Sequence, residues 1–416
     1  MSELSAARAL SRGFDRMLRD PVWGDVPLTK EFEGLFRSEA FQFLDGVRQL
    51  GPVALVYPGA THSRRSHSLG VYALARKLAI SLSERGQLAQ ATETGLRSFL
   101  AAALCHDLGH FPYAHSLKEL PLSPHEALGA DIVESELSPL VEACGADPEA
   151  VASIMDKTRT IEPGSELQLY RRLLSGVLDP DKVDYLTRDA FFCGVPYGVQ
   201  DADYIVRRIL VSGQSPAIDE KGAMSVEAVL FSKYQMYRSV YWHPDVRAAT
   251  AMVKKALLCG AEQGLLELES LYGLGDAGFA AIFPKTESWA LPAREAFAGR
   301  LYRRVFELAF DPSNPSHEDM RDLARRSEAE ASLAAAAGLA VEDVVIDLPE
   351  PIQFESDLPF IPSKGGTAPE PGALTGFFPG PEAAQALGSS LRRLRIFVRA
   401  DTEKQALKNL AEELLA

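Results

Sequence analysis

The chain has few cysteines, no long apolar run and no excess of basic residues. Its four cysteines are scattered without a CxxC pair, which argues against a disulfide framework and against a cysteine zinc site. No stretch approaches the roughly 20 consecutive apolar residues of a membrane helix. The N-terminal segment mixes acids and bases and lacks the apolar core of a signal peptide. We therefore expect a soluble, cytoplasmic protein that does not insert into a membrane.

The charge balance limits the class of ligand. Lys and Arg (43 residues) are outnumbered by Asp and Glu (57 residues), and the formal net charge is −14. A protein that binds a long nucleic acid usually presents a broad basic face that neutralises many phosphates. A small phosphate ligand needs only a metal ion and a few local bases. The composition thus disfavours a long nucleic acid as the main substrate, leaving it as an alternative only, and does not exclude a small phosphate ligand.

The texture of the sequence changes near residue 260. Before it, apolar residues recur three and four positions apart, as in residues 71–78 and 126–137, which is typical of packed helices. After it, Gly and Pro interrupt the helical pattern. We predict a mainly α protein, with an all-helical core over residues 1–260 and, over residues 261–416, a helical extension and a small α+β C-terminal region.

The C-terminal region contains strand signals as well as helix signals. Residues 344–348 and 394–398 are short apolar runs of the kind that form strands. Residues 402–415 predict a closing helix that begins with a capping-box spacing. Residues 363–372 are rich in Gly and Pro and predict a loop. We find no internal repeat.

Histidine is rare in the chain and strongly clustered. Six of the eight histidines lie between residues 62 and 125, and imidazole is both a common metal ligand and the usual acid or base near neutral pH. His106 and Asp107 follow an apolar helical segment, and Gly109 and Pro112 then break the helix before His115. One such pair cannot saturate a metal ion, so further ligands must come from distant segments.

Two other segments complete a recognisable pattern. His67-Ser68-Leu69-Gly70 precedes the His106-Asp107-Leu108-Gly109-His110 segment, and Asp181-Lys182-Val183-Asp184-Tyr185 follows it. This order of H, HD and D resembles the HD superfamily of phosphohydrolases, and more closely its deoxynucleotide triphosphohydrolase (dNTPase) branch. The similarity runs from about residue 20 to residue 260 and includes the motifs DPVWG, QLGP, YPGATHSR and YQMYR.

The resemblance implies an HD-domain core and a metal centre. Its matching positions for metal ligands are His67, His106, Asp107 and Asp181. Two histidines and two carboxylates suit Mn, Mg, Fe, Co, Ni or Zn. The expected reaction is hydrolysis of a deoxynucleoside triphosphate to deoxynucleoside and triphosphate, by attack of metal-activated water on the α-phosphate.

The resemblance also implies catalytic and substrate-contacting residues. A 5′-oxygen leaves poorly as an alkoxide, so an imidazole should protonate it; His115 is our first choice and His125 our second, with His110 and Glu126 beside them. The expected substrate contacts with phosphates and sugar are Gln49, Arg64, Lys182, Tyr185, Asp189, Lys233 and Tyr241.

The chain departs from the dNTPase pattern in three places. A carboxylate usually follows the His115 position by three residues, whereas this chain has Lys118 there and Glu119 next to it. The segment from His115 to His125 is short. Lys233 stands where an arginine is common, and lysine lacks the bidentate fork of arginine.

Other functions are compatible with the same residues. The metal centre could serve a phosphodiesterase or single-strand nuclease, or the chain could be a nucleotide-binding regulatory protein with little turnover. The His106-Asp107 pair could be a buried helix cap, and the substrate-binding residues could be ordinary packing or solvated charges. Relatives are often homo-oligomers, so we expect a homo-oligomer here too.

Overall fold

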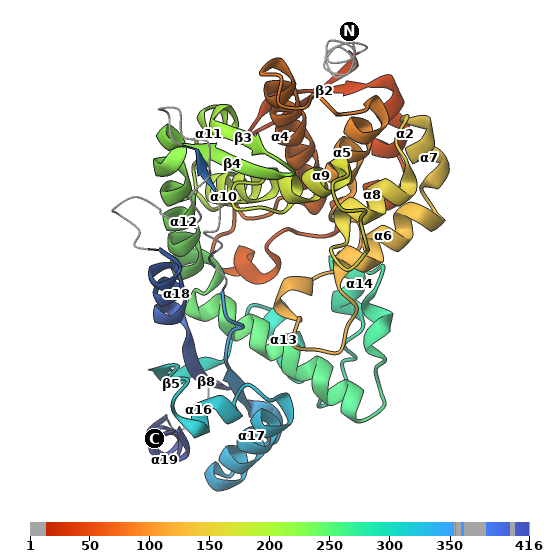
Figure 1. Ribbon diagram of the computed structural model, residues 1–416. Coiled ribbons are helices and arrows are strands. Elements are labelled where there is room, and N and C mark those ends of the chain that lie inside the picture. The colour runs from red at the N-terminus through yellow and green to blue at the C-terminus, as the bar shows by residue number, and fades with distance from the viewer. Residues whose placement is uncertain (1–13, 353, 355–358, 362–379, 400–403, 416) are drawn as a thin grey trace.

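The computed structural model describes residues 14–352, 354, 359–361, 380–399 and 404–415. Within these ranges the protein is mainly helical, with a smaller α+β unit at the C-terminal end (Figure 1). The predicted fold class is therefore confirmed. None of the described helices combines the length and the apolar character needed to cross a membrane.

The helical core contains one long helix surrounded by shorter ones. Helix α4 packs against α5 and α10, and α5 packs against α8. The core helices are α2 (Lys30–Phe36), α3 (Glu39–Phe43), α4 (Arg64–Glu84), α5 (Glu93–Cys105), α6 (His125–Ser135), α7 (Ser138–Ala143), α8 (Pro148–Met155), α9 (Glu166–Leu174), α10 (Pro180–Cys193), α11 (Ala202–Arg208), α12 (Ala223–Met236) and α13 (Pro244–Glu262).

Side-chain caps fix the starts of the helices that carry the site. The Ser63 hydroxyl accepts a hydrogen bond from the Ser66 amide at the start of α4, and Thr92 caps α5 in the same way through the Gly95 amide. The Asp179 carboxylate accepts from the Lys182 amide at the start of α10. Each cap satisfies an amide that has no partner within its helix. The caps thereby set where the first turns of α4 and α10 lie.

The structure adds two small sheets to the predicted helical core. Strands β1 (Phe14–Asp20) and β2 (Gly24–Thr29) form an antiparallel hairpin, and β3 (Ile209–Ser212) pairs antiparallel with β4 (Ser215–Asp219). A short strand, β7 (Phe360–Ile361), lies parallel to β4. Gly213 has a φ of 62° in the turn between β3 and β4, a conformation that glycine adopts without strain.

The C-terminal unit is built on an antiparallel sheet with the order β5-β8-β6. The predicted strands 344–348 and 394–398 are confirmed as β6 and β8, whereas β5 was not predicted. The predicted loop 363–372 lies outside the described residues. The elements are α14 (Asp276–Ala281), α15 (Leu291–Phe297), β5 (Arg303–Ala309), α16 (Pro315–Asp319), α17 (Leu323–Ala337), β6 (Val344–Asp347), α18 (Gly380–Leu391), β8 (Arg393–Val398) and α19 (Lys404–Leu415).

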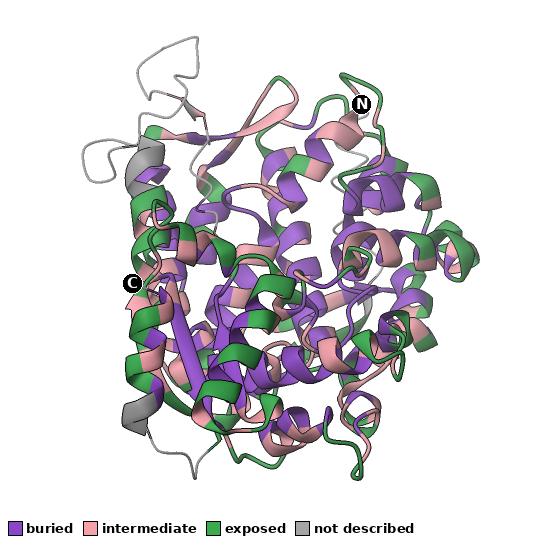
Figure 2. Cartoon of the chain, turned by 90° about the horizontal axis from the view of Figure 1, so that it is seen from below, coloured by how far each residue is buried: buried purple, intermediate pink, exposed green. Residues whose placement is uncertain are grey.

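Helix α13 joins the two parts of the molecule. It runs between the core helices and the C-terminal strands (Figure 1). Buried residues fill the interior of the molecule, and exposed residues lie mostly towards its outside (Figure 2). Successive residues of β6 and β8 alternate between two apolar clusters, so Val345 and Phe397 pack towards α13 while Ile346 and Ile396 pack towards α17 and α19. The division of the chain at residue 260, which falls within α13, stays a prediction.

Candidate active site

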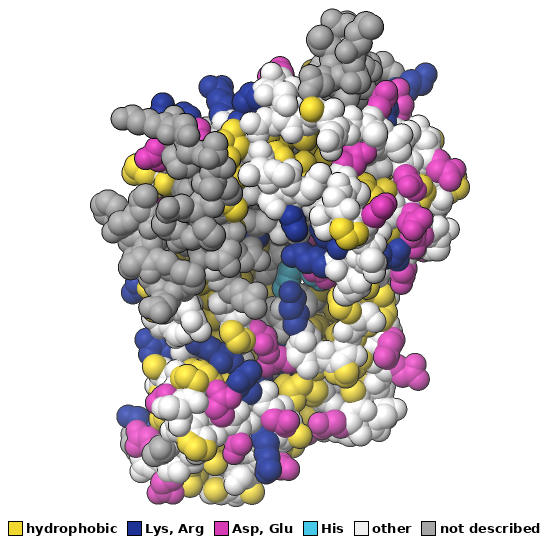
Figure 3. Space-filling view, viewed as in Figure 1, with side chains coloured by type: hydrophobic (Ala, Val, Ile, Leu, Met, Phe, Trp, Pro, Cys, Tyr) yellow, Lys and Arg dark blue, Asp and Glu magenta, His cyan; other side chains and the backbone are white. Residues whose placement is uncertain are grey.

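Four side chains from three helix ends meet at one point of the core. His67 lies in the first turn of α4, His106 and Asp107 follow the last turn of α5, and Asp181 lies in the first turn of α10. These are the four predicted metal ligands. A hollow in the surface exposes histidine there, with Lys and Arg side chains at its rim (Figure 3).

The ligand atoms of these residues are close enough to share one ion. The Nε2 atoms of His67 and His106 are 3.2 Å apart. Asp181 Oδ1 lies 3.1 Å from His67 Nε2 and 3.8 Å from His106 Nε2. Ligand atoms of His67, His106 and Asp107 all lie within 4.8 Å of one another. The Asp181 side chain is 37% exposed, so the site opens towards solvent on that side.

The two imidazoles are oriented by their other nitrogen. His67 Nδ1 donates to Asp184 Oδ2 at 2.7 Å, and His106 Nδ1 donates to the Ala103 carbonyl at 3.0 Å. With the Nδ1 protons engaged, both Nε2 atoms of the neutral rings turn lone pairs towards the same point. Facing lone pairs need a positive charge between them. The donor set therefore fits a divalent cation.

Electrostatics at His67 give the same indication. Burial alone would lower the pKa of His67, but its hydrogen bonds to Asp181 and Asp184 outweigh burial and raise the pKa to about 10. The carboxylates of Asp181 and Asp184 thus favour a positive charge at this position. A bound divalent ion would satisfy them in place of the proton.

A buried ion-pair network supports His67 from behind. Arg188 is fully buried and donates to Asp184 at 2.8 and 2.9 Å and to Asp20 at 2.9 Å. The indole Nε1 of Trp23 also donates to Asp184. A Cβ atom at Gly70 on α4 would overlap the side chains of Asp184 and Arg188. Sequence reasoning missed this network, although the four-residue spacing of Asp184 and Arg188 on one helix was a visible signal.

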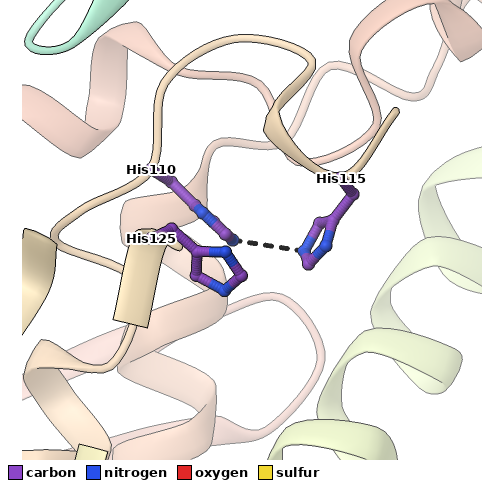
Figure 4. Close-up of side chains that lie close together, drawn as sticks. All are labelled: His110, His115 and His125. Carbon is purple, nitrogen blue, oxygen red and sulfur yellow. Dashed lines mark hydrogen bonds between the residues drawn. The ribbon is translucent and has the colours of Figure 1, made fainter. Parts of the chain in front are cut away.

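Three further histidines form a second cluster beside the first. His110 comes from the turn after α5, His115 from the short helical turn Ala114–Ser116, and His125 from the start of α6 (Figure 4). His110 Nε2 lies 3.2 Å from both His115 Nε2 and Asp107 Oδ1. The His110 and His125 ring centroids are 3.7 Å apart. All three predicted histidines are thus brought together.

Their environment lowers the pKa of all three rings. Burial, and then the positive charge of Arg64, hold the pKa of His110 well below its usual value. Burial, and then His115, do the same for the pKa of His125. Glu126 Oε1 lies 3.3 Å from His125 Nε2.

Glu119 does not supply the carboxylate that the sequence lacks at Lys118. Its carboxylate pairs instead with Lys254 of α13 and with Arg326 of α17 at 3.0 Å, while Lys118 is exposed. Glu119 thus interacts with the C-terminal unit.

The predicted phosphate-binding cations all have protein partners. The buried Arg64 donates to Asp107 at 2.9 Å, and within the described part of the chain its Nε atom has no hydrogen-bond partner. Lys182 Nζ donates to Asp179 and to the Gly176 carbonyl at 2.8 and 2.7 Å. Lys233 Nζ lies 5.4 Å above the ring of Phe354.

The predicted sugar contacts gather around Asp189. Its Oδ2 atom accepts a hydrogen bond from the Tyr241 hydroxyl at 2.6 Å, and its Oδ1 atom lies 2.8 Å from His62 Nε2. Burial, and then the charge of Asp189, raise the pKa of Tyr241, which keeps this hydroxyl a donor. The backbone N–H of Gln49 donates to the His62 carbonyl, and the buried Gln49 Oε1 has no hydrogen-bond partner among the residues that the structure describes. His62 thus links two of the predicted contacts.

Tyr185 lies one turn before Asp189 on α10 and is partly buried. Burial raises its pKa well above the usual value for tyrosine, and the charges of Tyr237 and Asp181 add to this shift. The raised pKa keeps this hydroxyl a potential hydrogen-bond donor.

Comparisons with known proteins agree with the architecture. Residues 64–188 match the HD domain and residues 200–362 match the HD associated region. An uncharacterized Bacillus subtilis protein is 34% identical over 247 residues, which is 58% of this chain and 55% of the relative. Human deoxynucleoside triphosphate triphosphohydrolase SAMHD1 is 24% identical over 392 residues, which is 80% of this chain and 62% of the relative. The chain thus spans less than two thirds of these curated relatives.

A solved structure shares the fold over nearly the whole chain. The phosphohydrolase from Bacteroides thetaiotaomicron superposes with a TM-score of 0.73 at 21% identity, covering 92% of this chain and all of that one. The fold therefore extends through the C-terminal unit as well as the helical core.

Proposed function

Since this chain is an HD-domain protein that resembles the dNTPase branch, we propose that it is a divalent-metal-dependent phosphohydrolase that cleaves deoxynucleoside triphosphates to deoxynucleoside and triphosphate. One observation carries the proposal. The lone pairs of His67 and His106 converge with Asp107 and Asp181, and the histidine cluster lies next to that point.

The four ligands leave room for substrate on one side. His67 and Asp107 are buried and His106 is only partly exposed, whereas the Asp181 side is open to solvent. A bound divalent ion would polarise a phosphate oxygen and lower the pKa of a bound water. The donor set suits Mn, Mg, Fe, Co, Ni or Zn.

The histidine cluster is placed to deliver a proton. His115 is exposed and can reach a substrate in the hollow, while His110 and His125 lie behind it. A triphosphate brings negative charge, which raises the pKa of a neighbouring imidazole. We assign the protonation of the leaving 5′-oxygen to His115, with His125 and Glu126 as the next proton carriers.

The remaining predicted contacts bind the two ends of the nucleotide. Arg64, Lys182 and Lys233 stabilise the phosphates, each exchanging part of its present partnership for phosphate oxygens. Gln49 Oε1 accepts a sugar hydroxyl, because a buried acceptor without a partner gains a hydrogen bond when the hydroxyl arrives. Tyr241 and Asp189 close the pocket around the sugar.

A product-resolved assay tests the proposal. The purified protein should contain about one divalent ion per chain, measured by anaerobic metal analysis, and should release tripolyphosphate from a panel of dNTPs. Asp107→Ala is the inactive control. Release of phosphate or pyrophosphate alone would contradict triphosphohydrolase activity. Cleavage of single-stranded oligonucleotides in place of dNTPs would favour the nuclease, and tight nucleotide binding without product would favour a regulatory protein.

The proposed assembly state is a homo-oligomer. Light scattering coupled to gel filtration tests this expectation, and a mass equal to one chain at micromolar concentration would contradict it.

A further inference from the structure

The loop that carries His115 depends on contacts with other parts of the protein for its shape. His115 lies in a three-residue helical turn and is itself exposed, so its own side chain contributes little to holding the loop. Two positions before it, Tyr113 has a φ of 65°. A bulky residue rarely adopts this left-handed conformation, and it persists only where the surroundings impose it.

Two kinds of contact impose that shape. The Tyr113 ring stacks on Phe279 of α14, with centroids 5.3 Å apart and planes at 18°. Leu117 and Leu120 are buried in the apolar cluster formed with α13, α14 and α15. These contacts hold the loop on its apolar side, on both sides of His115.

On its polar side, the loop is held by the carboxylate of Glu119. This carboxylate receives both Nη atoms of Arg326, at 3.0 and 3.3 Å, and also the ammonium of Lys254. The three side chains are 7%, 6% and 7% exposed. Two further bonds from Arg326 to the Met320 carbonyl, at 2.9 and 2.7 Å, fix its guanidinium. Because the planar guanidinium of Arg326 is itself held in place, its two hydrogen bonds define both the position and the orientation of the Glu119 carboxylate.

We propose that Arg326 is a positioning residue that fixes His115 through Glu119, so that the C-terminal unit completes the active site in the helical core. The inference rests on the proposed function, because it concerns the residue that we assign as proton donor. The arrangement also accounts for the departure at Lys118: the carboxylate next to it anchors the loop from behind and does not join the histidine cluster.

The role differs from a general contribution to stability. Proton transfer requires the imidazole to lie within hydrogen-bond reach of the leaving oxygen, and a displacement of about 1 Å can lower a rate by roughly 100-fold. The proposed metal ligands lie on α4, directly after the last turn of α5, and on α10, whereas Glu119 lies on none of these helices. Loss of the contact between Arg326 and Glu119 should therefore lower kcat and leave metal content and KM nearly unchanged.

The test compares Arg326→Gln with Arg325→Gln. Arg325 is the adjacent residue of α17, 64% exposed, and pairs only weakly with Glu328 at 3.5 Å. We expect Arg326→Gln to lower kcat by roughly 10- to 100-fold with unchanged metal content, and Arg325→Gln to match the wild type. Arg326→Lys, which keeps the charge without the fork, should be intermediate, and it replaces the glutamine variant if that variant does not fold.

A double-mutant comparison separates positioning from other effects. In a His115→Gln background, Arg326→Gln should lower kcat no further, because the group that it positions is absent. An equal loss in both backgrounds, or an unchanged kcat in the folded single variant, would overturn the proposal.

Amide hydrogen exchange gives a readout that does not need activity. Exchange over residues 112–118 should accelerate at least about 10-fold in Arg326→Gln while exchange in α4 and α10 stays at the wild-type rate. Unchanged loop exchange refutes the positioning role whether or not the protein hydrolyses dNTPs. If the wild type were inactive but loop exchange were accelerated in the variant, the proposed function would be refuted and the positioning role of Arg326 would still hold.

Discussion

Replacing Gly70 by alanine should destabilise the protein although alanine is the better helix former. In an exposed helix the exchange would stabilise by about 1 kcal/mol. At Gly70 the new methyl would occupy the space of the Asp184 carboxylate and the Arg188 guanidinium, which are both fully buried. One of the two must move, and breaking a buried ion pair costs about 3–5 kcal/mol. The net loss should be about 2–4 kcal/mol.

The same change should weaken metal binding. Asp184 orients His67 through the 2.7 Å bond to Nδ1, and loss of such a supporting contact typically lowers metal affinity about 10- to 100-fold. Urea denaturation measures the first effect and chelator competition the second.

Gly34→Ala on α2 is the matched control. A Cβ atom there would lie 3.4 Å from Leu140 Cδ2, an ordinary contact, and the residue is exposed. This variant should be as stable as the wild type or more stable, by up to about 1 kcal/mol. If Gly70→Ala behaved like Gly34→Ala in both measurements, the buried pair would not be the support of His67 that we infer.

Four further variants or comparisons test separate parts of the site. Asp107→Ala should lose the ion but keep its circular dichroism spectrum; retained metal would remove Asp107 from the ligand set. His115→Gln should lower kcat by about 10²- to 10⁴-fold at constant metal content, and an unchanged kcat would transfer the role to His125. The wild type should prefer dATP to ATP by roughly 5- to 150-fold in kcat/KM, and Tyr241→Ala should reduce this preference; equal rates in the wild type would defeat the sugar-pocket assignment. Burial alone would raise the pKa of Glu119, but its cationic partners lower it from 4.5 to about 2, so the carboxylate stabilises the fold above pH 4.5 and less as the pH falls towards 2. Glu119→Gln should thus cost about 3 kcal/mol at neutral pH, with the difference in urea stability vanishing near pH 2, and a constant difference would contradict the assignment.

The sequence predicted much of the site because its residues occur in contiguous motifs. The motif that holds His106 and Asp107 also carries His110, so their proximity follows from the geometry of one helix end. The convergence of His67 and Asp181 with them rested on resemblance alone, since nothing local in either segment specifies a partner. All four side chains meet in the structure, whereas their roles as ligands stay predictions.

What the sequence did not predict depends on long-range pairing. The hairpin β1–β2 contains alternating charges and a proline that obscure its strand pattern. Arg188 and Asp20 are far apart in the sequence, and only the fold shows that they form a buried ion pair. Glu119 looked like a substitute for a missing acid because its partner Arg326 lies more than two hundred residues away. In each case the missing information was the identity of the contacting residue.

The order of strands in the C-terminal sheet has a consequence for biosynthesis. The central strand β8 is the last of the three in the sequence, and both β5 and β6 pair with it rather than with each other. At typical elongation rates the ribosome needs roughly 5–15 s to proceed from β5 to β8. During that interval the helical core can fold, while the sheet on which α17 rests lacks its middle. A nascent chain would then hold all four proposed metal ligands before the sheet that supports Arg326 is complete, so we expect metal uptake to precede the onset of catalysis as the protein is made.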